Sequence, residues 1–187
     1  MNNGLLRKIF FAALLGIAAL PECFAQNMFI AGSEYNIYKK PQFWDCYAGF
    51  NLELFSEHLQ NDFLLSFGHI TSHSAQEEGT KDRFMFRFKD NIYFSYDFKL
   101  IGFRAGISAS FGIYDVPDFP AAWDLFFDIA GFAGICIFPK AFIAVTIDVL
   151  PGYALAFRVT DAPAGLINDS GFMLPISVGL RFNIDKL

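Results

Sequence analysis

The sequence RFMFRFKDNIYFSYDF, at residues 83–98, alternates large apolar side chains with polar ones. This alternation has the period of a β-strand, in which successive side chains point to opposite faces. The apolar face contains Phe84, Phe86, Phe88, Ile92, Phe94, Tyr96 and Phe98. The opposite face includes Arg83, Arg87, Lys89, Ser95 and Asp97. The segment therefore predicts a long strand with an apolar environment on one side and a polar environment on the other.

The same two-residue period recurs through the rest of the chain. Each of the last four repeats is long enough for a tilted membrane-spanning strand, which needs about 9–11 residues. Residues 83–98 count as one strand, and the less regular segment at 28–38 is included. The predicted strands are residues 28–38, 44–54, 63–67, 83–98, 101–112, 123–137, 143–157 and 172–184. We therefore predict an all-β fold, an eight-stranded antiparallel transmembrane β-barrel.

The two faces of these strands suit lipid outside and a polar lumen inside. A buried Phe or Leu contributes about 2–3 kcal/mol, whereas a Lys or Arg facing lipid near the midplane costs about 2–4 kcal/mol. The apolar face of the last four strands contains no Lys or Arg. The predicted inward charges are Arg83, Arg87, Lys89, Lys99, Arg104, Arg158 and Arg181 against Asp45, Glu53, Asp97, Asp124, Asp128, Asp148 and Asp185. Because an eight-stranded lumen is just wide enough for side chains, we expect these charges to neutralise one another in a filled interior.

The connections differ in length at the two ends of the predicted barrel. Short periplasmic turns and long external loops are typical of outer-membrane barrels. The short connections are near 57–62, 99–100 and 139–140, and the long ones are 72–80, 114–121 and 160–170. A rival register begins at Trp44 and turns at residues 89–91, but it places a long connection on the periplasmic side. The favoured register puts Asp90 on the lipid-facing side, which we expect only near the outer interface.

The N-terminal segment has the layout of a secretory signal peptide. Arg7 and Lys8 precede an apolar stretch at residues 9–20, and small residues stand at Cys23 and Ala25. These are the −3 and −1 positions of a cut after Ala25. We expect residues 1–25 to be a signal peptide and residues 26–187 to form the barrel in the cell outer membrane.

Composition restricts the partners of the chain. The net charge of −5 argues against nucleic acid, which needs a basic surface to neutralise phosphates. The expected partners are the lipid bilayer and an extracellular protein or surface, with the protein itself a monomer. Outside the signal segment only Cys46 and Cys136 remain, and the register points them outward and inward, so we predict two free thiols. No motif indicates a cofactor.

Few residues suggest chemistry. His69 and His73 have the spacing of a metal pair on a helix, but on a strand end the same spacing favours a solvated loop. Ser72 beside His73 is the place to look for a lipid-modifying enzyme at the outer rim. Adjacency in sequence does not make a hydrogen-bonded dyad, and we expect no catalytic, cofactor-binding or metal residues.

Four phenylalanines fall on predicted inward positions, namely Phe126, Phe132, Phe138 and Phe142. They could line a small apolar pocket for hydrophobic molecules. The simpler interpretation is that they fill the lumen, because barrel interiors of this size are usually filled by side chains.

In length and strand pattern, residues 28–187 resemble the small eight-stranded outer-membrane proteins of the OmpA, OmpX and OmpW kind. The resemblance implies a membrane barrel, and for OmpW-like proteins the passage of hydrophobic molecules. Our leading hypothesis is a non-enzymatic barrel with a structural role or an interaction role through its extracellular loops. A conduit or binder for small hydrophobic molecules is the alternative.

Two other architectures fit parts of the pattern. A soluble lipocalin-like barrel also alternates, but it would place the apolar face inward and leave Arg87, Arg104 and Arg181 outside. A two-helix membrane hairpin between Leu125 and Phe157 would be interrupted by charged residues.

Overall fold

The computed structural model describes residues 28–38, 42–56, 58–72, 81–115, 123–158, 165–166 and 170–184. Every long element is a β-strand, and all strand pairs are antiparallel. The strands are β1 (Met28–Asn36), β2 (Gln42–Ser56), β3 (Leu59–Ser72), β4 (Lys81–Asp97), β5 (Ile101–Asp115), β6 (Trp123–Ile137), β7 (Ile143–Val149), β8 (Gly152–Arg158), β9 (Gly165–Leu166), β10 (Gly171–Met173) and β11 (Pro175–Asn183). No helix among the described residues is long and apolar enough to cross a membrane.

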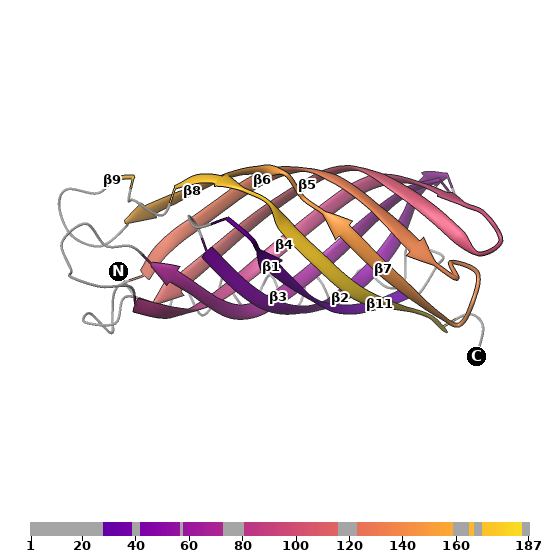
Figure 1. Ribbon diagram of the computed structural model, residues 1–187, viewed down its shortest axis with the longest axis horizontal. Helices are drawn as coiled ribbons and strands as arrows, with labels where there is room; N and C mark the ends of the chain where they lie inside the picture. The colour runs from indigo at the N-terminus through magenta and orange to yellow at the C-terminus, as the bar shows by residue number, and fades with distance from the viewer. Residues whose placement is uncertain are drawn as a thin grey trace.

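The sheet closes into a barrel of eight spanning strands, two of which are each divided into two shorter strands (Figure 1). β7 and β8 both pair with β6 and together form the seventh spanning strand. β10 and β11 together form the eighth, which pairs with the seventh along its length. Strand β1 then pairs with β11 from Met28↔Asn183 to Asn36↔Pro175 and closes the ring. The predicted eight-stranded antiparallel barrel is confirmed.

Proline interrupts the last two spanning strands, once between β7 and β8 and once between β10 and β11. Pro151 lies between β7 and β8, and Leu174 precedes Pro175 at the start of β11. A proline has no N–H to donate to the sheet, so the ladder breaks there. Neighbouring strands nevertheless stay in register across these breaks. The Leu150 N–H donates to the Pro175 carbonyl at 2.9 Å, and the Gly131 N–H donates to the Pro151 carbonyl at 2.8 Å.

The apolar face points outward. Along β4, Ile92 is 36% exposed and Phe94 63%, whereas their neighbours Tyr93 and Ser95 are 1% and 3% exposed. Arg87, Arg104 and Arg181, which a lipocalin-like barrel would leave outside, are all buried. The soluble alternative and the helical hairpin are therefore both wrong. An apolar outer wall around a polar, charged interior is the arrangement of a transmembrane β-barrel.

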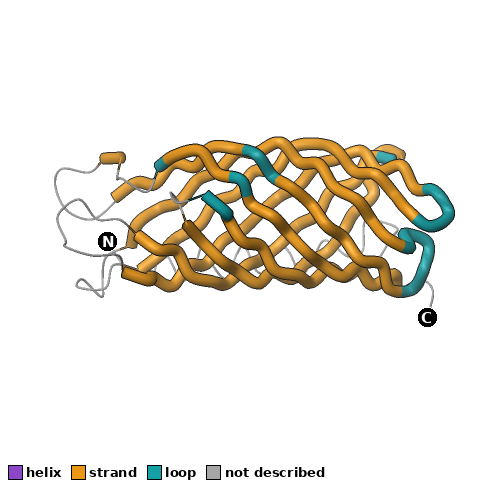
Figure 2. The backbone as a smooth tube through the Cα atoms, in the orientation of Figure 1, coloured by secondary structure: helices purple, strands orange, loops and turns teal. Residues whose placement is uncertain are grey.

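The connections divide between the two ends as predicted. The turns at 57–58, 98–100 and 138–142 join strands at one end, and Figure 2 shows the last two of these as loops at the end where the C-terminus is marked. The connections 73–80, 116–122 and 159–170 join strands at the other end. β4 runs unbroken from Lys81 to Asp97, so the rival register with a turn at 89–91 is wrong.

The two cysteines of the described residues are free thiols, as predicted. Cys46 is exposed on the outer wall and Cys136 is buried inside.

Candidate functional site

The lumen contains a network of buried ion pairs. Arg87 of β4 is at its centre and is 1% exposed. Its guanidinium donates to Glu34 at 2.6 Å, to Asp45 at 2.7 Å and to Asp128 at 3.2 Å. Lys89, two residues further along the same face, also donates to Glu34. Strands β1, β2, β4 and β6 are thereby joined across the interior.

A second group of charges lies closer to the short turns. Arg104 of β5 donates to Asp148 of β7 at 2.6 Å, and its other terminal nitrogen lies 3.9 Å from Asp62 of β3. Arg181 of β11 lies 3.3 Å from the same Asp62 carboxylate and donates to the Tyr93 hydroxyl at 2.7 Å. The Tyr93 hydroxyl in turn donates to Asp62 at 2.9 Å. Each arginine is therefore matched by a carboxylate that comes from another strand.

Aromatic rings cover the flat faces of these arginines. The Arg87 guanidinium lies 4.6 Å from the centre of the Phe43 ring. Arg104 lies 5.3 Å from the ring centres of both Tyr93 and Phe132, and these two rings stack at 5.0 Å. Stacking of this kind is favourable for a planar guanidinium, more so when it is removed from water. The rings also occupy the space that water would otherwise fill between the charges.

Toward the long connections the interior becomes apolar. Arg83 pairs with Asp124 at 3.1 Å, and both side chains are buried. An apolar cluster of buried side chains extends from here to the rings beside Arg104, namely Phe43, Ile70, Met85, Tyr93, Tyr114, Phe126, Ala130, Phe132, Leu150, Ala154, Ala156 and Met173. Aromatic and aliphatic groups thus fill this part of the lumen.

Large buried side chains pack closely in the described part of the interior. Two small internal cavities lined by described residues hold about 10 Å³ each. That is close to the lower limit for a single water molecule. The described part of the lumen is therefore a packed, electrically paired core.

Most of the predicted lumen charges take part in this network. Two of its members, Glu34 and Asp62, are absent from the predicted set: the first lies in the least regular predicted strand and the second at a predicted turn. The strand period could have found both, because each has outward neighbours on either side. Asp97 is exposed at the end of the barrel, where it lines a small internal cavity with Cys136 and Arg181. Lys99, predicted to face inward, is instead exposed in the turn at 98–100. Glu53 is half-buried, and the side chains of Arg158 and Asp185 lie outside the described residues.

The alternative of a pocket lined by four phenylalanines does not form, and the favoured interpretation that they fill the lumen holds for only two of them. Phe126 and Phe132 point inward and are packed in the core cluster. Phe138 and Phe142 are 52% and 38% exposed, in the turn between β6 and β7. Phe138 has φ of 57°, so the chain reverses at that residue and the strand period no longer applies.

The residues that suggested chemistry are not brought together. His69 is exposed on the outer wall, where its ring stacks on Trp44 with the centroids 6.5 Å apart. His73 and the Ser72 side chain lie outside the described residues. Within the described ranges, no group of three or more His, Cys, Asp or Glu side chains could hold a metal ion.

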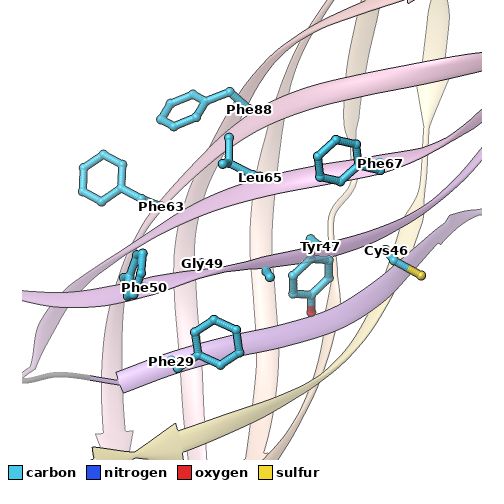
Figure 3. Close-up of a pocket in the computed structure, with 10 residues that line it drawn as sticks. Phe29, Cys46, Tyr47, Gly49, Phe50, Phe63, Leu65, Phe67 and Phe88 are labelled. Carbon is cyan, nitrogen blue, oxygen red and sulfur yellow. The ribbon is translucent and has the colours of Figure 1, made fainter. Parts of the chain in front are cut away.

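The outer wall carries a groove of about 420 Å³ over β1 to β4 (Figure 3). It exists because the outward residues Cys46 and Ala48 are small while the surrounding ones are large. The lining residues are Phe29, Cys46, Tyr47, Ala48, Gly49, Phe50, Phe63, Leu65, Phe67 and Phe88. The groove opens on the lipid-facing side, so acyl chains can fill it.

One carboxylate also faces the lipid. Asp90 pairs in register with Phe63 and accepts a hydrogen bond from the Asn61 amide at 2.7 Å. Its place near the outer interface stays a prediction. Asp90 lies midway along β4 between Phe84 and Tyr96, because the strand extends seven residues beyond it toward the short turn. The asparagine supplies the donor that lipid cannot.

Comparisons with known proteins find structural likeness alone. No protein-family profile matches the sequence, and no curated protein is significantly similar to it. The chain is similar to the crystal structure of Neisserial surface protein A, with 8% identity, a TM-score of 0.45, and coverage of 85% of this chain and 95% of that one. It is also similar to Ail, the attachment invasion locus protein of Yersinia pestis, with 13% identity, a TM-score of 0.38, and coverage of 84% and 97%. The fold assignment itself rests on the strand pairing and burial described above.

Proposed function

We propose that the protein is a non-enzymatic barrel of the outer membrane that acts through the connections at its long-loop end. The observation that carries this proposal is the filled lumen. Buried ion pairs centred on Arg87 and an apolar cluster occupy the interior, so the barrel wall serves as a support and not as a channel. The bilayer is its first partner, since the outer wall is apolar.

Three long connections would then carry the interaction with a protein or surface outside the cell. They contain Glu77, Glu78, Asp118, Asp161 and Asp169, and no Lys or Arg. The β1–β2 connection at the same end contains Lys39 and Lys40. A partner with a positively charged surface would therefore be attracted to the three long connections and not to this end as a whole. The proposal includes export through a signal peptide at residues 1–25 and a monomeric barrel from residue 26.

Orientation can be tested with epitope tags in intact cells. One tag replaces part of 73–80, and a control tag is placed in the turn at 98–100. We expect antibody to bind the first tag on intact cells and the second only after the outer membrane is permeabilised. Equal labelling of both, or labelling of the turn alone, would contradict the proposed location or orientation.

Closure of the lumen can be tested in planar bilayers. The refolded barrel should give no stable single-channel conductance, and replacement of 73–80 and 160–170 by short turns should leave the fold intact. Heat-dependent mobility on a gel reports folding of the shortened variant. Steady conductance by the unmodified barrel would instead support the alternative role as a conduit.

A further inference from the structure

Two carboxyl groups lie opposite each other on neighbouring strands inside the barrel. Glu34 of β1 pairs in register with Asp45 of β2, and their side chains are 1% and 0% exposed. The same terminal nitrogen of Arg87 donates to Glu34 at 2.6 Å and to Asp45 at 2.7 Å. Like charges directly opposite each other on adjacent strands repel, and burial strengthens the repulsion. We call Glu34 and Asp45 the carboxyl pair.

Three carboxyl groups share two cations at this point of the lumen. Arg87 also donates to Asp128 of β6 at 3.2 Å, and Lys89 donates to Glu34. All five side chains of this set are 3% exposed or less. If all of them were ionised, one buried negative charge would have no counterpart, which is strongly unfavourable. The set therefore lacks one positive charge.

The described groups that surround the set do not supply this charge. The nearby cations already have carboxylates of their own, in the pairs Arg83–Asp124, Arg104–Asp148 and Arg181–Asp62 on β4, β6, β5, β7, β11 and β3. The polar side chains that touch the set are neutral: Ser66 of β3 donates to Asp45 at 3.0 Å, and Ser110 of β5 donates to Asp128. Beside them the hydroxyls of Tyr47 on β2 and Ser177 on β11 bond each other at 2.7 Å.

One oxygen atom of the carboxyl pair shows where the charge is missing. Both oxygens of Glu34 accept from a cation, Oε1 from Arg87 and Oε2 from Lys89. In Asp45, Oδ2 accepts from Arg87 and Ser66, whereas Oδ1 is buried and has no hydrogen-bond partner. An ionised oxygen in that position bears the full cost of its lost hydration. The described residues include no group of three or more His, Cys, Asp or Glu placed to hold a metal ion, and a proton needs no such group.

We propose that Glu34 and Asp45 bind one proton between them, held on Asp45, and that this proton completes the charge balance of the lumen at neutral pH. Glu34 then stays ionised between Arg87 and Lys89, and the set of five side chains is neutral. The inference goes beyond the proposed function, because it concerns the interior of the barrel and not its long connections.

The bound proton links the stability of the barrel to pH. The carboxyl groups of the unfolded chain are ionised above about pH 5, so unfolding releases the proton. A proton that the folded barrel holds and the unfolded chain does not makes stability highest at lower pH. This stability is lost as the pH rises far enough to remove the proton from the folded barrel.

Infrared spectroscopy of the refolded barrel in vesicles detects the proton directly. A protonated carboxyl has a C=O stretching band that an ionised carboxylate lacks. We expect this band at neutral pH in the difference spectrum between the unmodified barrel and the Asp45→Asn variant. The matched control Asp97→Asn changes an exposed carboxyl at the barrel end and should give no such difference. Glu34→Gln should also remove the band, because two carboxylates then balance two cations.

Urea unfolding at a series of pH values gives an independent measure. From about pH 5 upward, the unfolding constant of the unmodified barrel should rise about tenfold per pH unit relative to that of Asp45→Asn, until the folded barrel loses its proton. Every other titrating group is common to both chains and cancels in the comparison. If Asp45→Asn does not fold, the infrared band of the unmodified barrel should still disappear reversibly as the pH is raised. Replacing sodium by choline at constant ionic strength should change neither measurement.

The outcomes separate this inference from the proposed function. A difference spectrum without the band, or a ratio of unfolding constants that does not vary with pH, would show that Asp45 is ionised and overturn the inference. Stability that depends on sodium and not on pH would assign the missing charge to a metal ion and also overturn it. Steady conductance by the unmodified barrel would instead contradict the proposed function, whatever the protonation of the carboxyl pair.

Discussion

Replacing Arg87 with methionine should destabilise the barrel more than any surface substitution. Arg87 is 1% exposed and donates to three carboxylates, at 2.6, 2.7 and 3.2 Å. Methionine fills part of the volume but leaves Lys89 as the one cation beside Glu34, Asp45 and Asp128. Removing one partner of a buried ion pair costs about 3–5 kcal/mol, because the remaining charge is left uncompensated.

Urea unfolding of the refolded barrel in neutral detergent measures this loss. Tryptophan fluorescence and the heat-dependent gel shift should report the same transition. Lys99→Met is the matched control, since Lys99 is exposed at the barrel end and should change the free energy of unfolding by less than about 0.5 kcal/mol. Arg87→Lys keeps the charge but loses the planar fork, so its loss should fall between the two.

A small effect would refute the reasoning. If Arg87→Met lowers the free energy of unfolding by less than about 1 kcal/mol, the lumen charges behave like solvated surface pairs. Water would then penetrate the interior, and the closed lumen on which the proposed function depends would be in doubt. Conductance of the Arg87→Met variant in planar bilayers would show directly whether the passage had opened.

Three further predictions concern the barrel wall and the thiols. Asp90→Asn removes a lipid-facing charge and should raise the free energy of unfolding in vesicles by about 1–2 kcal/mol, since acidic residues cost less there than the roughly 2–4 kcal/mol of a base; a loss of stability would indicate that the carboxylate has a membrane partner. Gly49→Ala should lower the free energy of unfolding by about 1–3 kcal/mol, because the added Cβ would collide with the backbone of β3. The control Gly131→Ala places its Cβ in ordinary contact with a nearby proline at 3.7 Å and should be neutral or slightly stabilising. Urea titration compares the two variants, and equal effects would contradict the packing. A membrane-soluble maleimide should label Cys46 in the folded barrel and Cys136 only after denaturation, and mass spectrometry of digested protein would show the reverse order if the faces were assigned wrongly.

The turns and the ends of the network were the least predictable parts. Phe138 and Phe142 follow the inward period of β6 and β7 in sequence, yet the chain turns at Phe138 with φ of 57° and exposes both. Asp62 falls in a predicted turn, where acidic residues are common. It is instead buried in β3, where Arg104 and Arg181 approach it from strands that are far away in sequence.

By itself the sequence determined the barrel and its faces. Alternation along residues 83–98 and its repeats fixes which side chains share a face, and the placement of every charged group but Asp90 on one face of the spanning strands fixes which face can meet lipid. The partners within the lumen were decided by the tertiary structure. Arg87 reaches Glu34, Asp45 and Asp128 because closure of the sheet brings β1, β2 and β6 around β4. A strand's own period carries no information about the height of a residue on a distant strand; the stagger of the closed ring sets those heights, and with them the pairs that fill the lumen.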